Sequence, residues 1–133
     1  MNLRARSAIR WAQWIVGYMS LGPLAVALDL LVHFFPSTPA IQLMRNNGFY
    51  VHALWLGCGV LAILSVVLLS VRPLYGYATL VVLTAAYSPV SVAVWHQSTM
   101  LHDWLSLAAI AFATYGVFAG SQPEVQRADH ETQ

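Results

Sequence analysis

Histidine and aspartate are the side chains whose types and positions in this sequence could do chemistry. Asp29 precedes His33 by four residues, and Asp103 follows His102 directly. Four histidines stand at the edges of long apolar stretches, namely His33, His52, His96 and His102. Carboxylates and imidazoles can exchange protons near neutral pH, ligate metals and hydrogen-bond to quinones. The question is which elements bring these groups together.

The composition indicates that those elements lie in a membrane. Of the 133 residues 59% are hydrophobic and 8% are charged, which is not typical of a soluble globular domain. The formal net charge of +1 gives no electrostatic reason to bind nucleic acid. All basic residues are Arg, which excludes Schiff-base lysine chemistry. Cys58 is the sole cysteine, so the chain contains no internal disulfide or CxxC redox pair.

Four apolar stretches are long enough, at about 20 residues, to cross a bilayer as helices. They are residues 11–35, 49–71, 74–95 and 100–119. The link 36–48 is a loop rich in Pro, Asn and Gly, whereas Arg72-Pro73 and residues 96–99 are short links that force antiparallel neighbours. The sequence therefore predicts an all-α, integral membrane, up-down four-helix bundle over residues 1–120. The polar tail, 121–133, is expected to be disordered or bound to a partner.

The arginines predict an orientation, because cytoplasmic loops carry the excess of positive charge. Five arginines fall on one side if both termini are cytoplasmic, namely Arg4, Arg6, Arg10, Arg72 and Arg127. Arg45, in the first loop, does not fit this pattern. The expected protein is a multi-pass protein of a bacterial inner (plasma) membrane, with both termini and the tail in the cytoplasm.

This topology places the four histidines of the spans at the outer ends of four helices. Asp29 and His33 are four residues apart, so they share a helix face about 6 Å apart along the axis. Asp29 should lie inside the hydrocarbon, where a carboxylate must face the bundle interior, a partner or a cavity. Asp29 is the first residue whose presence needs an explanation.

Three interpretations of the outer residues stay open. In the first, histidines are simply tolerated at the headgroup level. In the second they bind haem b or a metal: His33, His52, His96 and His102 are candidates for holding a cofactor. The metal candidates, for copper or zinc, are Asp29, His33, His52, His102 and Asp103. In the third, Asp29 and His33 handle protons or contact a quinone.

The chain also resembles the DoxX-like family of small four-helix membrane proteins between about Ala12 and Phe118. The resemblance rests on four segments: Val32-His33-Phe34-Phe35-Pro36, the glycine-bearing span from Gly48 to Leu69, Arg72-Pro73, and Tyr87-Ser88-Pro89. It implies the same fold and a link to membrane redox chemistry, including quinol oxidation. Family members often carry a Glu in span two, where this chain has Leu56-Gly57-Cys58-Gly59, so no catalytic residue is transferred.

These observations favour a small integral subunit or accessory protein of a larger membrane complex, linked to redox chemistry through quinone, haem or metal near the outer face. Its expected partners are the lipid bilayer and other membrane subunits or further copies of the chain. One alternative is an oligomeric small transporter or channel. The other is an outer-leaflet enzyme with an Asp/His site, which would be an oxidoreductase component.

Overall fold

The computed structural model describes residues 2–96 and 100–119, and every regular element in these residues is helical. The elements are α1 (Leu3–Val32), α2 (Pro39–Arg45), α3 (Phe49–Val71), α4 (Pro73–Trp95), α5 (Met100–Thr114) and the π-helical η1 (Tyr115–Ala119). Four helices are long and apolar enough to cross a membrane, the fourth running through α5 into η1 as Leu101–Ala119. The predicted all-α four-helix membrane fold is confirmed. The predicted tail, 121–133, lies outside the described residues.

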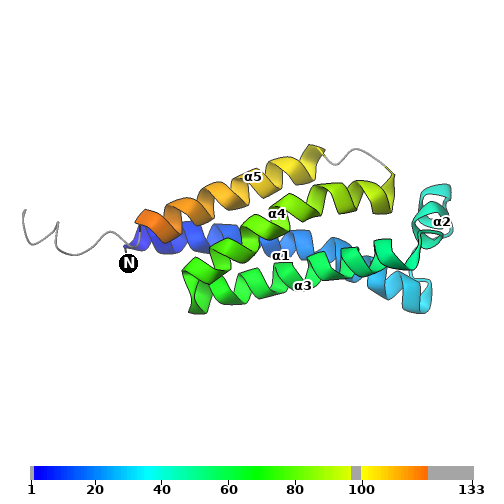
Figure 1. The fold of residues 1–133 in the computed structure, drawn as a ribbon, viewed down its shortest axis with the longest axis horizontal. Coiled ribbons are helices and arrows are strands. Elements are labelled where there is room, and N and C mark those ends of the chain that lie inside the picture. The colour runs from blue at the N-terminus through cyan, green and yellow to red at the C-terminus, as the bar shows by residue number, and fades with distance from the viewer. Residues whose placement is uncertain (1, 97–99, 120–133) are drawn as a thin grey trace, which may run out of the picture.

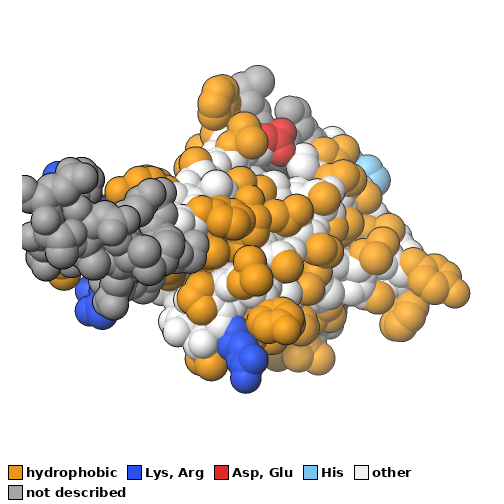
Figure 2. Space-filling model, turned by 60° about the vertical axis from the view of Figure 1, so that its left-hand side comes forward, with side chains coloured by type: hydrophobic (Ala, Val, Ile, Leu, Met, Phe, Trp, Pro, Cys, Tyr) orange, Lys and Arg blue, Asp and Glu red, His pale blue; other side chains and the backbone are white. Residues whose placement is uncertain are grey.

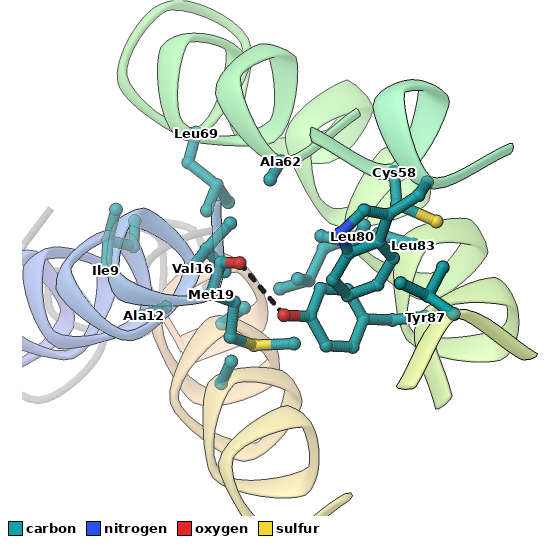
Figure 3. Packing of buried hydrophobic residues seen from close by; sticks show 14 of the residues in the cluster. Ile9, Ala12, Val16, Met19, Cys58, Ala62, Leu69, Leu80, Leu83 and Tyr87 are labelled. Carbon is teal, nitrogen blue, oxygen red and sulfur yellow. Dashed lines mark hydrogen bonds between the residues drawn. The ribbon is translucent and has the colours of Figure 1, made fainter. Parts of the chain in front are cut away.

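The long helices pack as a ring in which each helix contacts its two neighbours. α1 packs against α3 and α5, and α4 packs against the same two helices from the other side (Figure 1). Only Arg72 separates α3 from α4, so these two helices are antiparallel neighbours along their length. The core between the helices is apolar, with Val16 and Met19 of α1 facing Leu80 and Leu83 of α4 (Figure 3).

Two glycines allow the helices to approach closely. A Cβ at Gly59 of α3 would lie 2.8 Å from the Cβ of Pro23 of α1, and a Cβ at Gly76 of α4 would overlap the backbone of Leu69 of α3. A Cβ at Gly57, also on α3, would face open space instead. The glycines at 59 and 76 therefore set the α1–α3 and α3–α4 spacing.

α1 is longer than the predicted first span at its N-terminal end and shorter at its C-terminal end. Asn2 caps it, accepting a hydrogen bond from the Ala5 backbone N–H at 2.7 Å. At 30 residues it is about 45 Å long, against about 30 Å of bilayer hydrocarbon. It ends at Val32 because His33 takes the left-handed conformation (φ 50°), and its N–H bonds to the Asp29 carbonyl at 2.8 Å.

The predicted loop 36–48 contains a short helix, α2. Thr38 caps α2 and Pro39 occupies its first turn, a pairing that favours helix starts. α2 lies at the end of the bundle opposite the N-terminus (Figure 1), with Met44 buried and Ile41 packed against the core. The α1–α3 connection is thus a folded cap over one end of the bundle.

The outer surface of the bundle is apolar. In the most apolar window of each span, 28–33% of the residues are buried inside the chain. Hydrophobic side chains cover much of the face in Figure 2, and the Arg side chains lie toward its left-hand and lower margins. A surface of this kind is stable in a bilayer and not in water, so the chain is a multi-span membrane protein.

Candidate functional site

Asp29 is fully buried near the C-terminal end of α1, and its counter-charge is Arg45. The Nε of Arg45 donates to Oδ2 of Asp29 at 2.8 Å, and its Nη2 donates to Oδ1 at the same distance. This two-point geometry is the strongest arrangement of a guanidinium and a carboxylate. Arg45, which did not fit the charge pattern of the loops, is therefore the partner that Asp29 needs inside the membrane.

The ion pair also holds the chain that leaves α1. The Phe35 backbone N–H donates to Oδ1 of Asp29 at 2.8 Å, and Nη2 of Arg45 donates to the Phe35 carbonyl at 2.9 Å. A further bond joins Nη1 of Arg45 to the Ser37 hydroxyl at 3.2 Å. The hydrogen bonds to Asp29 raise the pKa of the Arg45 guanidinium above its ordinary value. We call Asp29, Phe35, Ser37 and Arg45 the clamp, because together they fix the cap to α1.

The structure brings neither His33 nor Asp103 into a polar site. The His33 side chain is exposed, and in the described chain no hydrogen bond joins its ring to the Asp29 carboxylate. Its backbone N–H, not its imidazole, contacts Asp29. Asp103 is exposed in the first turn of α5. The contact to Asp29 that four-residue spacing suggested thus goes to Arg45 instead.

His96 lies at the C-terminal end of α4, where its ring contacts Asn47 of the cap. Like His33 it takes the left-handed conformation, with φ 57°. The side chain of Asn47, in the cap, donates to the Val94 carbonyl at 2.8 Å, and the Asn47 Oδ1 lies 3.0 Å from Nε2 of His96. Asn47 therefore closes the C-terminal end of α4 much as the clamp closes that of α1.

The two remaining histidines face a different group of residues, between α3, α4 and α5. The Tyr87 ring of α4 lies 5.0 Å from the Trp55 ring of α3 and 5.6 Å from the His102 ring of α5, measured between centroids. His52 stands one turn before Trp55, and Ser91 stands one turn after Tyr87. We call His52, Trp55, Tyr87, Ser91 and His102 the interior cluster. Because α3 and α4 are antiparallel, His52 and Ser91 lie on its side nearer the cap.

The interior cluster holds hydrogen-bonding atoms that the described chain does not pair. They are Nδ1 and Nε2 of His52, Nε1 of Trp55, the Ser91 hydroxyl and Nδ1 of His102. Tyr87 is paired, since its hydroxyl donates to the Met19 carbonyl at 2.9 Å (Figure 3). An unpaired buried polar atom costs about 1–3 kcal/mol, so five of them would rival the stability of a whole domain. Ordered water or a bound polar group would satisfy these atoms.

The sequence does not reveal which residues contact the candidate histidines and Asp29. A tryptophan near the end of a span is typical of the headgroup level, yet Trp55 is 1% exposed. Ser91 gave no signal beyond being a polar residue in an apolar span, and Tyr87 entered only through the resemblance, although both side chains are buried. The signal in the sequence for Arg45 is its place in the first loop, away from the side of the predicted topology that carries the other arginines.

The predicted metal ligands are not gathered. Among residues 2–96 and 100–119, no three His, Cys, Asp or Glu side chains lie close enough to hold an ion together. No protein-family model, curated protein or solved structure matches this chain. The resemblance to the DoxX-like family therefore stays a prediction.

Proposed function

We propose that the chain is a small integral subunit or accessory protein of a larger membrane complex, of the DoxX-like kind. The observation that supports this role is the exposure of the spans: in the most apolar window of each span, no more than 33% of the residues are buried inside the chain. The remaining apolar surface can meet other subunits as well as lipid. The clamp adds to this, because both carboxylate oxygens of Asp29 are occupied by Arg45 and Phe35. An outer-leaflet enzyme that uses Asp29 as its acid or base has less support.

The interior cluster supports the redox link. His52 and His102 come from different helices, and their buried ring nitrogens lack partners in the described chain, unlike the exposed rings of His33 and His96. Nε1 of Trp55 only donates hydrogen bonds, so it repels a cation and suits a carbonyl oxygen. Of the three candidate groups, quinone, haem b and copper, a quinone therefore fits this donor set best. Haem b would use His52 and His102 as ligands, without Trp55.

Purification in mild detergent tests both parts of the proposal. We expect other membrane proteins to co-purify without crosslinker, and we expect a quinone in the organic extract of the purified protein. Absorption near the Soret region and metal analysis test haem and copper in the same sample. A homo-oligomer without other subunits would favour the transporter alternative, and a clean monomer would contradict the subunit role.

Histidine variants test the site. His52→Asn and His102→Asn should each lower the quinone content, because they remove ring nitrogens from the interior cluster. His33→Asn is the matched control, since His33 is exposed and Asn tolerates its left-handed backbone. Equal quinone content in all three variants would contradict the assignment to His52 and His102.

A further inference from the structure

A groove of about 550 Å³ runs along the outside of the bundle between α1 and α3, in the half that contains the N-terminus. Its lining includes Arg10, Trp14, Gly17, Tyr18, Leu21 and Val66. From Arg10 to Leu21 it extends along α1 for about 16 Å, at about 1.5 Å per residue. That length is close to the depth of one leaflet of the hydrocarbon core, about 15 Å.

The floor of the groove is open and its geometry is fixed. A Cβ added at Gly17 would meet no atom within 4 Å, so the groove continues down to the helix backbone. The Gln13 side chain crosses from α1 to α3, donating to the Val66 carbonyl at 2.8 Å and to the Ser70 hydroxyl at 2.6 Å. These bonds hold the two walls together below the exposed rings of Trp14 and Tyr18.

The charge at the end of the groove is positive. Arg10 closes it, and Arg4 and Arg6 stand in the preceding turns of α1. No acidic residue precedes Asp29 in the sequence, and in the part of the chain that the structure describes no ion pair involves Arg10. Trp14 and Tyr18 are the ring types that favour the headgroup level. The groove thus combines an apolar channel of leaflet depth with a cation where the headgroups begin.

We propose that this groove is a binding site for an anionic phospholipid, with one acyl chain lying over Gly17 and the phosphate paired with Arg10. An arginine near the membrane surface adds about fivefold to the affinity for an acidic lipid. Its guanidinium can also bind a phosphate through two parallel hydrogen bonds. The inference does not depend on which side of the membrane holds the N-terminus, and it is independent of the interior cluster.

Native mass spectrometry of the detergent-solubilised chain, titrated with phosphatidylglycerol or phosphatidylcholine, tests the proposal. We expect the first bound phosphatidylglycerol to be held at least about fivefold more tightly than phosphatidylcholine. Arg10→Gln should remove this preference and keep the weaker binding of phosphatidylcholine. Gly17→Leu should reduce the binding of both lipids, because its side chain would fill the floor of the groove.

Matched controls separate the groove from general effects. Arg6→Gln removes the same charge at an exposed position outside the groove lining, and Gly57→Leu adds the same side chain to α3 where a Cβ also meets open space. Both controls should bind lipid as the parent chain does. Equal affinity for the two lipids, or an equal loss in Arg6→Gln and Arg10→Gln, would overturn the proposal. Arg10 is exposed, so this comparison stands even if Gly17→Leu does not fold.

Discussion

A carboxylate in hydrocarbon needs a counter-charge, and for Asp29 the counter-charge comes from outside its own helix. Arg45 lies 16 residues later in the sequence, at the end of α2, with a side chain that is 16% exposed. The Asp29 carboxylate is thus enclosed by the chain, and the Arg45 side chain reaches the surface of the protein. Breaking such a pair by removing one partner costs more than the pair contributes, because the remaining charge stays buried.

Asp29→Asn is therefore expected to destabilise the protein by about 3–5 kcal/mol, and Arg45→Met by a similar amount. The double variant Asp29→Asn/Arg45→Met should lose clearly less than the sum of the two, since it buries no unpaired charge. Equilibrium unfolding in detergent measures all three. Asp103→Asn, at an exposed position, should change stability by no more than about 0.5 kcal/mol. Additive losses would show that the two residues do not act as a pair.

The sequence indicates that Asp29 needs a polar partner, but it does not identify Arg45 as that partner. Asp29 is conspicuous because it is the single acid within the first apolar span. Its spacing to His33 did not point to Arg45, which reaches Asp29 through the connection that follows the left-handed turn at His33. A contact that depends on the path of a 12-residue connection, 34–45, does not follow from helical periodicity.

Gly59 and Gly57 lie two residues apart on α3, but their surroundings differ. Gly59→Ala should destabilise the protein by about 1–3 kcal/mol, because its Cβ would press on Pro23 and separate α1 from α3. Gly57→Ala faces open space and should be neutral or stabilising by up to about 1 kcal/mol through helix propensity. The same unfolding measurement compares them. A Gly59→Ala protein as stable as Gly57→Ala would contradict the close approach at Pro23.

The membrane helices were predictable because length and apolar content alone define them. The ends of the helices were less predictable. α1 begins at Leu3, because the polar, Arg-bearing segment before the apolar stretch is also helical. α2 was missed because seven residues are too few for an apolar periodicity to stand out. The sequence nevertheless indicates where α2 starts, because Thr38 is a favourable N-cap residue and Pro39 follows it in the first turn.

The interior cluster could not be assembled from sequence. Its rings meet because α3, α4 and α5 are rotated so that Trp55, Tyr87 and His102 face one another. The rotation of a helix that is apolar on all sides has no strong signature, since its lipid-facing and core-facing positions look alike. The positions of His52 and His102 at span ends follow from the apolar stretches, whereas the helix face on which each lies is known only from the structure.

For the whole molecule, the two ends of the bundle differ in charge and in shape. One end carries Arg4, Arg6, Arg10 and Arg72, and the other carries the cap with α2. We expect the arginine end to be cytoplasmic. In a Cys58→Ala background, Gln42→Cys on α2 should react with a membrane-impermeant maleimide in intact cells, whereas Ser7→Cys should react only after the membrane is permeabilised.

Both positions are exposed in the structure, so a difference in labelling reports the side of the membrane and not burial. The parent chain is the control, because its Cys58 is buried and should stay unlabelled in either condition. Labelling of Ser7→Cys but not of Gln42→Cys in intact cells would reverse the orientation.

The clamp also has a consequence for biogenesis. During synthesis α1 leaves the ribosome before Arg45 does, so Asp29 reaches the membrane ahead of its counter-charge. A carboxylate within a spanning helix is costly as long as it lacks a partner. Asp29 gains this counter-charge only when α2 has been made and has folded back onto α1. The clamp thus links the final placement of the first helix to the segment that is synthesised after it.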